Sequence, residues 1–414
     1  MPRRKIIVIG GGPAGLMAAG QAAEAGAEAH LYEKMKRPGR KLGITGKGRC
    51  NLTNSAEIDE FIEHFGATGP FLRQAFHRFC NIELIDFFQT HGLTVKKERG
   101  GRIFPAGDKA SNVIAVLLKW LKRCNVRINT AAPVEKLLFN NGQVTGIITE
   151  GRSVTGDAVI LTTGGASYPA TGSTGDGYAL ARSAGHTIVP IRPALVPLET
   201  KEKIQKKMVG LILRNIRVSL FVNKKKQTEA FGELAFTEFG LSGPVILSLS
   251  GSIVDALRKK HTISVALDLK PALDEKKLDA RLLRDCASRS TEEMHSVLRG
   301  LLPREMVSTC LKLTKIPPGL SAGALTAGQR KSLRIWLKDF RLNIIRARPL
   351  SEAIVTAGGV NTQEVDPRSM QSRIINNLYI AGELLDVHAD TGGYNLQAAF
   401  STGLLAGRSA AKKE

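Results

Sequence analysis

The chain has 414 residues, of which 43% are hydrophobic and 23% are charged. This length is sufficient for two or three domains with a large core. Its five cysteines are odd in number and widely spaced, which argues against a disulfide framework or a structural zinc site. No apolar stretch is long enough for a membrane span or a secretory signal. We therefore expect a cytoplasmic protein that uses neither a membrane nor a metal.

The positive charge is unusually high and unevenly distributed. Lysine and arginine number 59 against 37 aspartates and glutamates, a formal net charge of +22. Residues 191–350 hold 30 basic and 15 acidic residues, residues 1–190 hold 24 and 15, and residues 351–414 hold 5 and 7. Such an excess favours binding to polyanions, nucleic acid first, although a basic surface can also serve solubility alone.

The first elements in chain order are a strand at residues 5–9, a glycine turn and a helix at residues 16–25. Gly10, Gly12 and Gly15 form G-x-G-x-x-G directly after the strand. A second strand, residues 29–33, ends at Glu33. This order predicts a dinucleotide site, with the pyrophosphate on the helix N-terminus and Glu33 on the ribose hydroxyls.

Alternating strands and helices continue to about residue 190. We expect a basic, glycine-rich loop at 37–54, helices at 57–66 and 69–91, and a helix at 112–124 capped by Ser111. Strands are expected at 127–129, 134–139, 144–149 and 157–165, with a hairpin turn at 140–142.

The middle of the chain has a different pattern. Apolar and polar residues alternate at 216–222 and 262–268, which predicts a small antiparallel sheet or barrel. Ser242 and Pro244 resemble the N-cap and first residue of a helix that extends to 257. Residues 274–338 are helical and basic, and 341–348 returns as a strand.

The last 64 residues again have the sequence pattern of a nucleotide-binding domain. Strands are expected at 355–360 and 378–382, followed by acidic residues and a glycine-led helix from Thr391. A helix N-terminus of this kind stabilises negative charge on a reduced flavin. The two ends together favour FAD over NAD, and no second G-x-G-x-x-G is present. We therefore expect NAD(P)H to act only as a transient electron donor.

Several motifs carry a family resemblance along the whole chain. They are G-R-K-L-G-I-T-G-K-G-R-C-N at 39–51, G-R-I-F-P at 101–105, K-A-S at 109–111, T-G-S-T-G-D-G at 171–177, and T-E-F-G-L-S-G-P at 237–244. By these motifs the chain is identified as a member of the BaiN/RdsA family of bacterial FAD-dependent oxidoreductases. One departure is Glu238, where many members carry histidine, which leaves the role of that histidine without a counterpart here.

The resemblance implies an α/β fold with a discontinuous Rossmann-like FAD-binding domain of the glutathione-reductase type. This domain would comprise 1–190 and 351–414, with an inserted antiparallel β-barrel at 191–272 and 340–350 and a small helical basic domain at 273–339. Noncovalent FAD would contact Gly10, Gly12, Ala14, Gly15, Glu33, Arg40, Lys41, Gly46, Gly48, Arg49, Cys50, Asn51, Val134, Gly382, Glu383, Asp386, Gly393, Asn395 and Leu396.

The expected function is reduction of a uridine in ribosomal RNA to dihydrouridine with electrons from NAD(P)H. A flipped or unpaired uracil would meet the flavin, and the basic 191–350 region would bind phosphates. Candidates for the proton donor or a substrate clamp are Cys50, Arg49, Arg102, Lys109, Glu238 and His388. Two alternatives stay open: an ene-reductase for a small apolar, steroid-like molecule, and a flavin-binding RNA or ribosome assembly factor without turnover.

Overall fold

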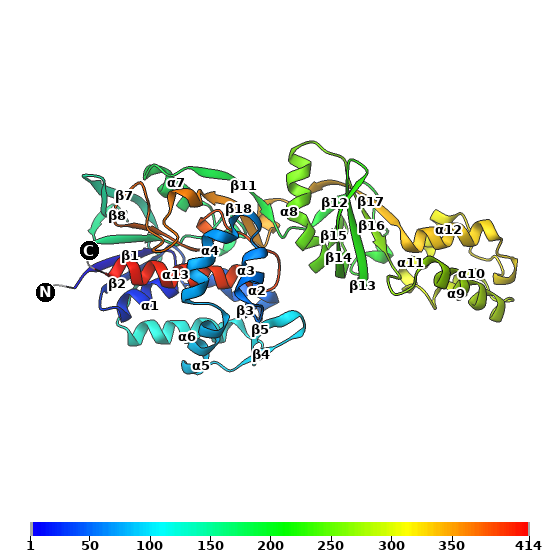
Figure 1. The fold of residues 1–414 in the computed structure, drawn as a ribbon, viewed down its shortest axis with the longest axis horizontal. Coiled ribbons are helices and arrows are strands. Elements are labelled where there is room, and N and C mark those ends of the chain that lie inside the picture. The colour runs from blue at the N-terminus through cyan, green and yellow to red at the C-terminus, as the bar shows by residue number, and fades with distance from the viewer. Residues whose placement is uncertain (1–2, 413–414) are drawn as a thin grey trace. The chain divides into compact units, whose positions relative to one another are not determined.

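A computed structural model describes residues 3–412 and divides them into two compact units. Unit 1 combines Met1–Ala194 with Leu350–Glu414, and unit 2 is Leu195–Pro349. Figure 1 shows both units with their helices and strands labelled. Unit 2 lies within the segment 191–350 that was expected as an insertion, and the expected domain boundaries stay a prediction. No described helix is both long and apolar enough to span a membrane.

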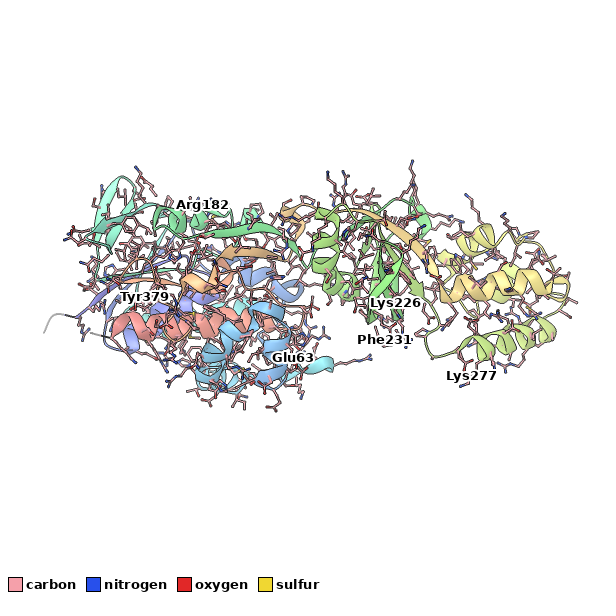
Figure 2. All side chains as sticks on the ribbon, turned by 45° about the horizontal axis from the view of Figure 1, so that its top comes forward. Glu63, Arg182, Lys226, Phe231, Lys277 and Tyr379 are labelled. Carbon is pink, nitrogen blue, oxygen red and sulfur yellow. The ribbon has the colours of Figure 1, made fainter. Side chains whose placement is uncertain are left out.

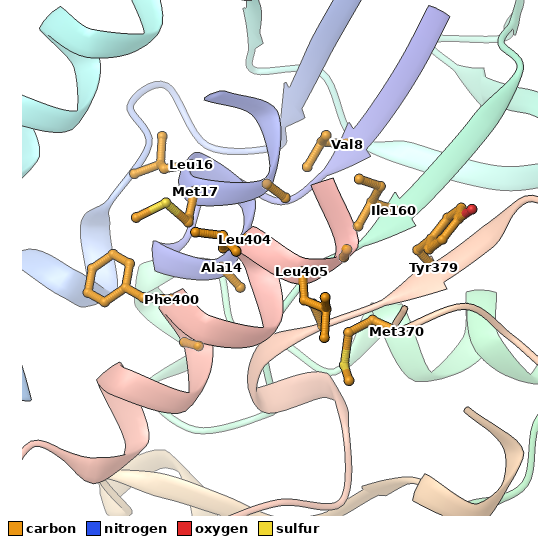
Figure 3. Close-up of a cluster of buried hydrophobic side chains, with 14 of the residues drawn as sticks. Val8, Ala14, Leu16, Met17, Ile160, Met370, Tyr379, Phe400, Leu404 and Leu405 are labelled. Carbon is orange, nitrogen blue, oxygen red and sulfur yellow. The ribbon is translucent and has the colours of Figure 1, made fainter. Parts of the chain in front are cut away.

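The core of unit 1 is a five-stranded parallel sheet with the order β19-β10-β1-β2-β6. Its strands are β1 (Lys5–Ile9), β2 (Glu28–Glu33), β6 (Arg127–Thr130), β10 (Ala158–Leu161) and β19 (Leu378–Ile380). The central strands are nearly continuous apolar runs because both of their faces are buried. Figure 3 shows Val8 and Ile160 of these strands beside side chains of two helices. The sheet thus joins the first and last parts of the chain.

The two helices in Figure 3 are α1 (Pro13–Glu24) and α13 (Tyr394–Ala411), which pack closely against each other. A Cβ on Gly403 would lie 2.3 Å from the Ala14 carbonyl oxygen, and one on Gly407 would lie 2.3 Å from that of Ala18. Two glycines one helical turn apart therefore permit the two backbones to touch, and they fix α13 over the N-terminal turn.

The remaining elements of unit 1 surround this layer. The helices are α2 (Arg40–Gly48), α3 (Ile58–Glu63), α4 (Gly69–Arg78), α5 (Asn81–Thr90), α6 (Ala110–Arg123) and α7 (Asp176–Ser183). Three small antiparallel sheets complete the list. The first contains β3 (Thr53–Asn54), β5 (Arg102–Pro105) and β4 (Val95–Lys97), and the second contains β7 (Val134–Asn140), β8 (Gln143–Thr149) and β9 (Arg152–Thr155). The third pairs β11 (Ile188–Ala194) with β18 (Val355–Val360).

Some expectations for unit 1 were wrong in detail. The single helix expected at 69–91 is two helices, because Phe79 is extended with φ −161° and ψ 93°. Ser111 does not cap α6, which begins at Ala110 after Lys109 and has no side-chain cap hydrogen bond. The loop expected at 37–54 contains α2, which is interrupted by non-helical backbone from Thr45 to Lys47.

Unit 2 contains a closed antiparallel barrel with the order β12-β15-β14-β13-β16-β17, which confirms the expected barrel. Its strands are β12 (Leu198–Thr200), β13 (Ile212–Val222), β14 (Lys225–Phe236), β15 (Gly240–Ser242), β16 (Ile263–Asp268) and β17 (Phe340–Ala347). Its helices are α8 (Pro244–Arg258), α9 (Glu275–Ser288), α10 (Met294–Leu298), α11 (Arg304–Thr314) and α12 (Ala327–Lys338).

The barrel and the helices of unit 2 share one buried core that includes Val218, Leu278 and Leu333. The expected separation of a helical domain at residue 273 therefore stays a prediction. Pro244 is the first residue of α8, as expected, but the N-cap is Gly243 and not Ser242. Gly243 has φ 94°, and a Cβ there would lie 2.8 Å from the Ala235 nitrogen, so glycine is required at this position.

Candidate functional site

The N-terminal glycine turn has the geometry of a phosphate-binding site. The Gly10 N–H donates to the Tyr32 carbonyl at 2.8 Å, and Gly10 has φ 104°. A Cβ on Gly15 would lie 1.8 Å from the Gly10 carbonyl oxygen, so glycine closes the turn. At Gly12, in contrast, a Cβ would meet no described atom within 4 Å. Space is therefore open beside Gly12 at the N-terminus of α1, where a helix favours anions.

Glu33 lies at the end of β2, and its carboxylate binds two backbone groups. One oxygen accepts from the Gly11 N–H and the other from the Met35 N–H, each at 2.7 Å. Each oxygen keeps a lone pair for a further donor. A pocket opens beside this carboxylate. It is lined by Ile9, Gly10, Tyr32, Glu33, Lys34, Ala132, Val134, Thr163, Gly172, Asp176 and Leu180. The structure thus places Gly10, Glu33 and Val134 around one pocket, and their contacts with the pyrophosphate, ribose and adenine of FAD stay a prediction.

Lys41 at the start of α2 contacts the C-terminal segment. Its ammonium lies 2.7 Å from the Glu383 carboxylate and donates to the Ser167 hydroxyl at 2.6 Å. Glu383 also accepts from the Thr356 N–H at 2.9 Å. Lys41 was expected beside the adenosine half, whereas its observed partner is a residue expected on the ribityl side. The neighbouring Arg40 is exposed.

The segment from Gly46 to Asn51 has unusual backbone geometry. Gly46, Gly48 and Cys50 all have positive φ, at 57°, 84° and 61°. A Cβ on Gly48 would meet no described atom within 4 Å. The Asn51 amide oxygen is buried and forms no hydrogen bond among the described residues. An orphaned buried acceptor beside a strained turn is the signature of a site that binds a ligand with donor groups.

Cys50 is fully buried in this turn. Burial raises the pKa of its thiol to about 12, and a hydrogen bond with Thr45 only partly opposes this effect. The thiol therefore stays protonated at neutral pH, yet its exposed fraction is 0%, so it presents no surface to a substrate. These properties favour a packing role over proton donation.

Arg49, the residue before it, is held by carboxylates. It forms ion pairs with Glu98 and with Asp108, the latter at 2.7 Å, and its guanidinium lies 4.2 Å from the centre of the Phe104 ring. Because both carboxylates bind the charged form, the pKa of Arg49 is raised. Arg49 is thus fixed as a permanent cation on the β4–β5 sheet.

The four other candidate catalytic residues are more accessible than Cys50. Arg102 and Lys109 are exposed, and Arg102 donates to the Arg99 carbonyl at 3.1 Å. Glu238 is exposed in unit 2, between β14 and β15. His388 is half-buried in the segment before α13. The geometry does not choose a proton donor among them.

The C-terminal segment is anchored to the N-terminal turn and to β3. Gly382 has φ 75°, and a Cβ there would lie 2.8 Å from that of Ala14. Gly393 is the N-cap of α13, where a Cβ would lie 2.4 Å from the Thr53 carbonyl oxygen. The Asn395 side chain accepts from the Ala389 N–H at 2.8 Å and donates to the same residue's carbonyl at 2.9 Å. Asp386 and Leu396 are half-buried.

Two groups of polar side chains near these segments were not expected from the sequence. His64 stacks on Tyr394 at 3.8 Å between ring centres and contacts the Asp390 carboxylate at 3.2 Å. The hydroxyls of Thr163 and Tyr178 are buried and form no hydrogen bond among the described residues. Burial chiefly, with nearby carboxylates, raises the pKa of Tyr178. The signal for Thr163 is its position directly after the β10 strand, while nothing in the sequence marks His64.

The parallel sheet, the glycine turn on α1 and the acid at the end of β2 define a Rossmann-type dinucleotide-binding protein. Comparison with known proteins identifies the family. Residues 4–409 match the family described as HI0933-like protein Rossmann domain. The chain belongs to this family, which confirms the expected membership among the BaiN/RdsA flavoprotein oxidoreductases.

Two curated relatives have different named activities. The 3-dehydro-bile acid delta(4,6)-reductase of Clostridium scindens is 36% identical, over 99% of both chains. The ribosomal RNA dihydrouridine synthase of Escherichia coli is 28% identical, over 97% of this chain and 96% of the relative. Among solved structures, a 3-ketosteroid delta1-dehydrogenase from Sterolibacterium denitrificans aligns over 99% of both chains with a TM-score of 0.54 and 12% identity, which shows a common fold.

Proposed function

We propose that this protein is an FAD-dependent reductase that converts a uridine of ribosomal RNA to dihydrouridine. FAD would lie with its adenosine beside Glu33 and Val134 and its pyrophosphate beside Gly12. The open space at Gly12 and the unpaired lone pairs of Glu33 support this placement. The orphaned acceptor of Asn51 supports a ligand donor at the next turn.

The remaining predicted contacts belong to the flavin half of the cofactor. Glu383 and Asp386 lie in the segment that leads into α13, and Asn395 lies in the first turn of this helix. The positive dipole end of α13 would stabilise negative charge on the reduced ring. When bound and reduced, FAD would supply the hydride for C6 of uracil, and a protein acid would supply the proton for C5. NAD(P)H would restore the reduced cofactor, so one NAD(P)H and one proton are consumed for each uridine.

The observation that carries RNA as substrate is the charge of the inserted segment. Residues 191–350 carry 15 more basic than acidic residues, whereas the C-terminal part of the nucleotide unit has a slight acidic excess. An uncharged substrate makes no use of this excess, while a phosphate backbone binds to it.

The test uses the FAD-loaded protein, NADPH and ribosomal RNA from a strain of the host that lacks the gene. Dihydrouridine, measured by mass spectrometry of nucleosides, should appear with time and should decrease as salt rises. A Gly12→Ala variant at limiting FAD serves as the control with reduced flavin occupancy. RNA that stays unmodified with either NADH or NADPH, while the flavin is reduced normally, would refute the proposal.

A second candidate is reduction of a steroid-like double bond. Its support is the higher identity, 36%, to the bile acid reductase than to the dihydrouridine synthase. The same preparation should then reduce a 3-dehydro-delta(4,6) bile acid, with little dependence on salt because few phosphate-like contacts are broken. Turnover of the bile acid without turnover of RNA would establish this alternative.

A further inference from the structure

Two basic turns meet at one end of the unit 2 barrel. The first joins β13 to β14 at Asn223 and Lys224, and the second joins α8 to β16. The Asn223 side-chain oxygen accepts from the backbone N–H of Thr262 at 3.0 Å and from its hydroxyl at 3.2 Å. The Asn223 N–H donates to the Thr262 carbonyl at 2.9 Å. Three hydrogen bonds therefore hold the two turns side by side.

These turns carry a group of cations that we name the barrel-end cluster. Its members are Lys224, Lys225, Arg258, Lys259 and Lys260. All five are exposed. None of the five forms an ion pair with a described acidic side chain, whereas the next residue, Lys226, is paired with Glu229 at 2.6 Å. Figure 2 labels Lys226 on this barrel. The cluster is thus a concentrated positive charge that the protein itself does not neutralise.

Part of this charge has a structural explanation. Arg258, Lys259 and Lys260 stand at the C-terminus of α8, where cations offset the negative end of the helix dipole. Lys224 and Lys225 lie on another element, so the dipole of α8 does not account for them. Their position against the end of α8 raises the local positive charge beyond what the helix requires.

Two members of the cluster have an unusual backbone conformation. Lys224 has φ 66° and Lys260 has φ 58°, a left-handed region that glycine occupies without cost and lysine does not. A cation therefore stands at two turn positions where the local structure favours glycine. Departures from local preference of this kind concentrate at functional positions.

We propose that the barrel-end cluster binds consecutive phosphates of the RNA substrate, an inference that rests on the proposed function. Lysine is suited to this task as a mobile point charge. A lipid surface fits less well, because stable membrane binding requires apolar side chains beside the cations. Residues 223–226 and 258–262 contain no exposed large hydrophobic side chain.

The experiment compares two doubly substituted proteins that lose equal charge. Lys224→Gly with Lys260→Gly removes two members of the cluster. Lys119→Gln with Lys122→Gln on α6 is the control of equal charge loss, since both lysines are exposed and lie outside residues 191–350. Glycine suits the backbone at each left-handed position, so all variants should fold, and circular dichroism with flavin absorbance verifies this.

Binding of FAD-loaded protein to a fluorescein-labelled oligouridine of about 20 nucleotides is measured across a series of salt concentrations. The cluster variant should bind about tenfold more weakly than wild type, and its log–log salt slope should fall by about 1.4, or 0.7 for each lost phosphate contact. The control should behave as wild type. Equal losses in the two variants, or no loss in either, would overturn the inference.

Two further measurements separate this inference from the proposed function. If the wild-type protein binds oligouridine with the expected salt slope but forms no dihydrouridine in ribosomal RNA, the proposed function fails and the cluster remains a phosphate site. Binding to phosphatidylserine vesicles in preference to oligouridine, with loss in the cluster variant alone, would overturn the RNA assignment.

Discussion

At the scale of single residues, the glycines of the N-terminal turn have two different reasons to be glycine. Gly15 is required by the fold, since a Cβ there would lie 1.8 Å from the Gly10 carbonyl oxygen. Gly12 has an ordinary φ of −78° and open space beside it, so the protein alone would tolerate a methyl group. Only a ligand that approaches the backbone closely gives Gly12 a reason to lack a side chain.

Substitution by alanine should separate these two roles. We expect Gly12→Ala to keep the free energy of unfolding within about 0.5 kcal/mol of wild type while flavin binding weakens about tenfold. Gly15→Ala should lose about 1 to 3 kcal/mol of stability as well as the flavin. Urea denaturation of the flavin-free proteins and titration with FAD measure both quantities. Wild-type FAD affinity in Gly12→Ala would contradict the proposed cofactor position.

The parts of the site that could be predicted are local in sequence. The turn around Gly10 and the acid Glu33 belong to one strand–turn–helix–strand unit, so spacing alone places them together. Lys41 and Glu383 are distant in sequence, and only the fold reveals that their charges pair. The expectation for Cys50 depended on exposure, which tertiary packing decides and sequence does not. The choice of proton donor therefore remained open.

At the scale of elements, the contact between α1 and α13 holds the two ends of the nucleotide unit together. Gly403 and Gly407 allow this contact because each faces a carbonyl oxygen of α1 at the distance where a Cβ would clash. Glycines within a helix usually lower its intrinsic stability. Here they permit close helix packing, and α13 extends over 18 residues despite them.

Gly407→Ala should therefore destabilise unit 1 by about 1 to 3 kcal/mol, because α13 must move away from Ala18. Gly251→Ala on α8 is the matched control, since a Cβ there meets no described atom within 4 Å. The control should gain about 0.5 to 1 kcal/mol from helix propensity. The free energies of unfolding in urea test both. A neutral Gly407→Ala would show that the helices separate without cost.

Element boundaries were harder to predict than element types. The break between α4 and α5 lies at Phe79, an apolar residue without the proline or glycine that usually marks a helix end. Ser111 and Ser242 resemble N-caps in sequence, but α6 and α8 begin after Lys109 and Gly243. In both cases tertiary structure determines where the chain enters the helix, so the capping preference of serine is overridden.

At the scale of the whole molecule, buried thiol and phenol groups make the free energy of unfolding depend on pH in the alkaline range. Burial raises the pKa of Cys50 to about 12, and of Cys80 and Tyr394 to about 11 and about 12. In the unfolded chain the thiols ionise near pH 9 and the tyrosine near pH 10. Because the folded values are higher, this stabilisation is complete below about pH 9 and is lost as pH rises toward 12.

The unfolding free energy should therefore fall between about pH 9 and about pH 12. Lysines also lose charge in this range, which reduces repulsion and acts in the opposite direction. A Cys50→Ala variant isolates the thiol, since its decrease with pH should be smaller than that of wild type. Parallel pH profiles for the two proteins would refute the assignment of a buried, protonated thiol.

The discontinuous sheet has a consequence for biosynthesis. Strand β19 and helix α13, which complete unit 1, are among the last elements to leave the ribosome. Unit 2 is continuous in sequence and can close its barrel while the first 194 residues still lack their partner strand and covering helix. The apolar face of α1 that receives α13 stays uncovered during this interval. The nascent N-terminal segment is thus a part of the chain that needs chaperone protection, and unit 1 is complete only after α13 has been made.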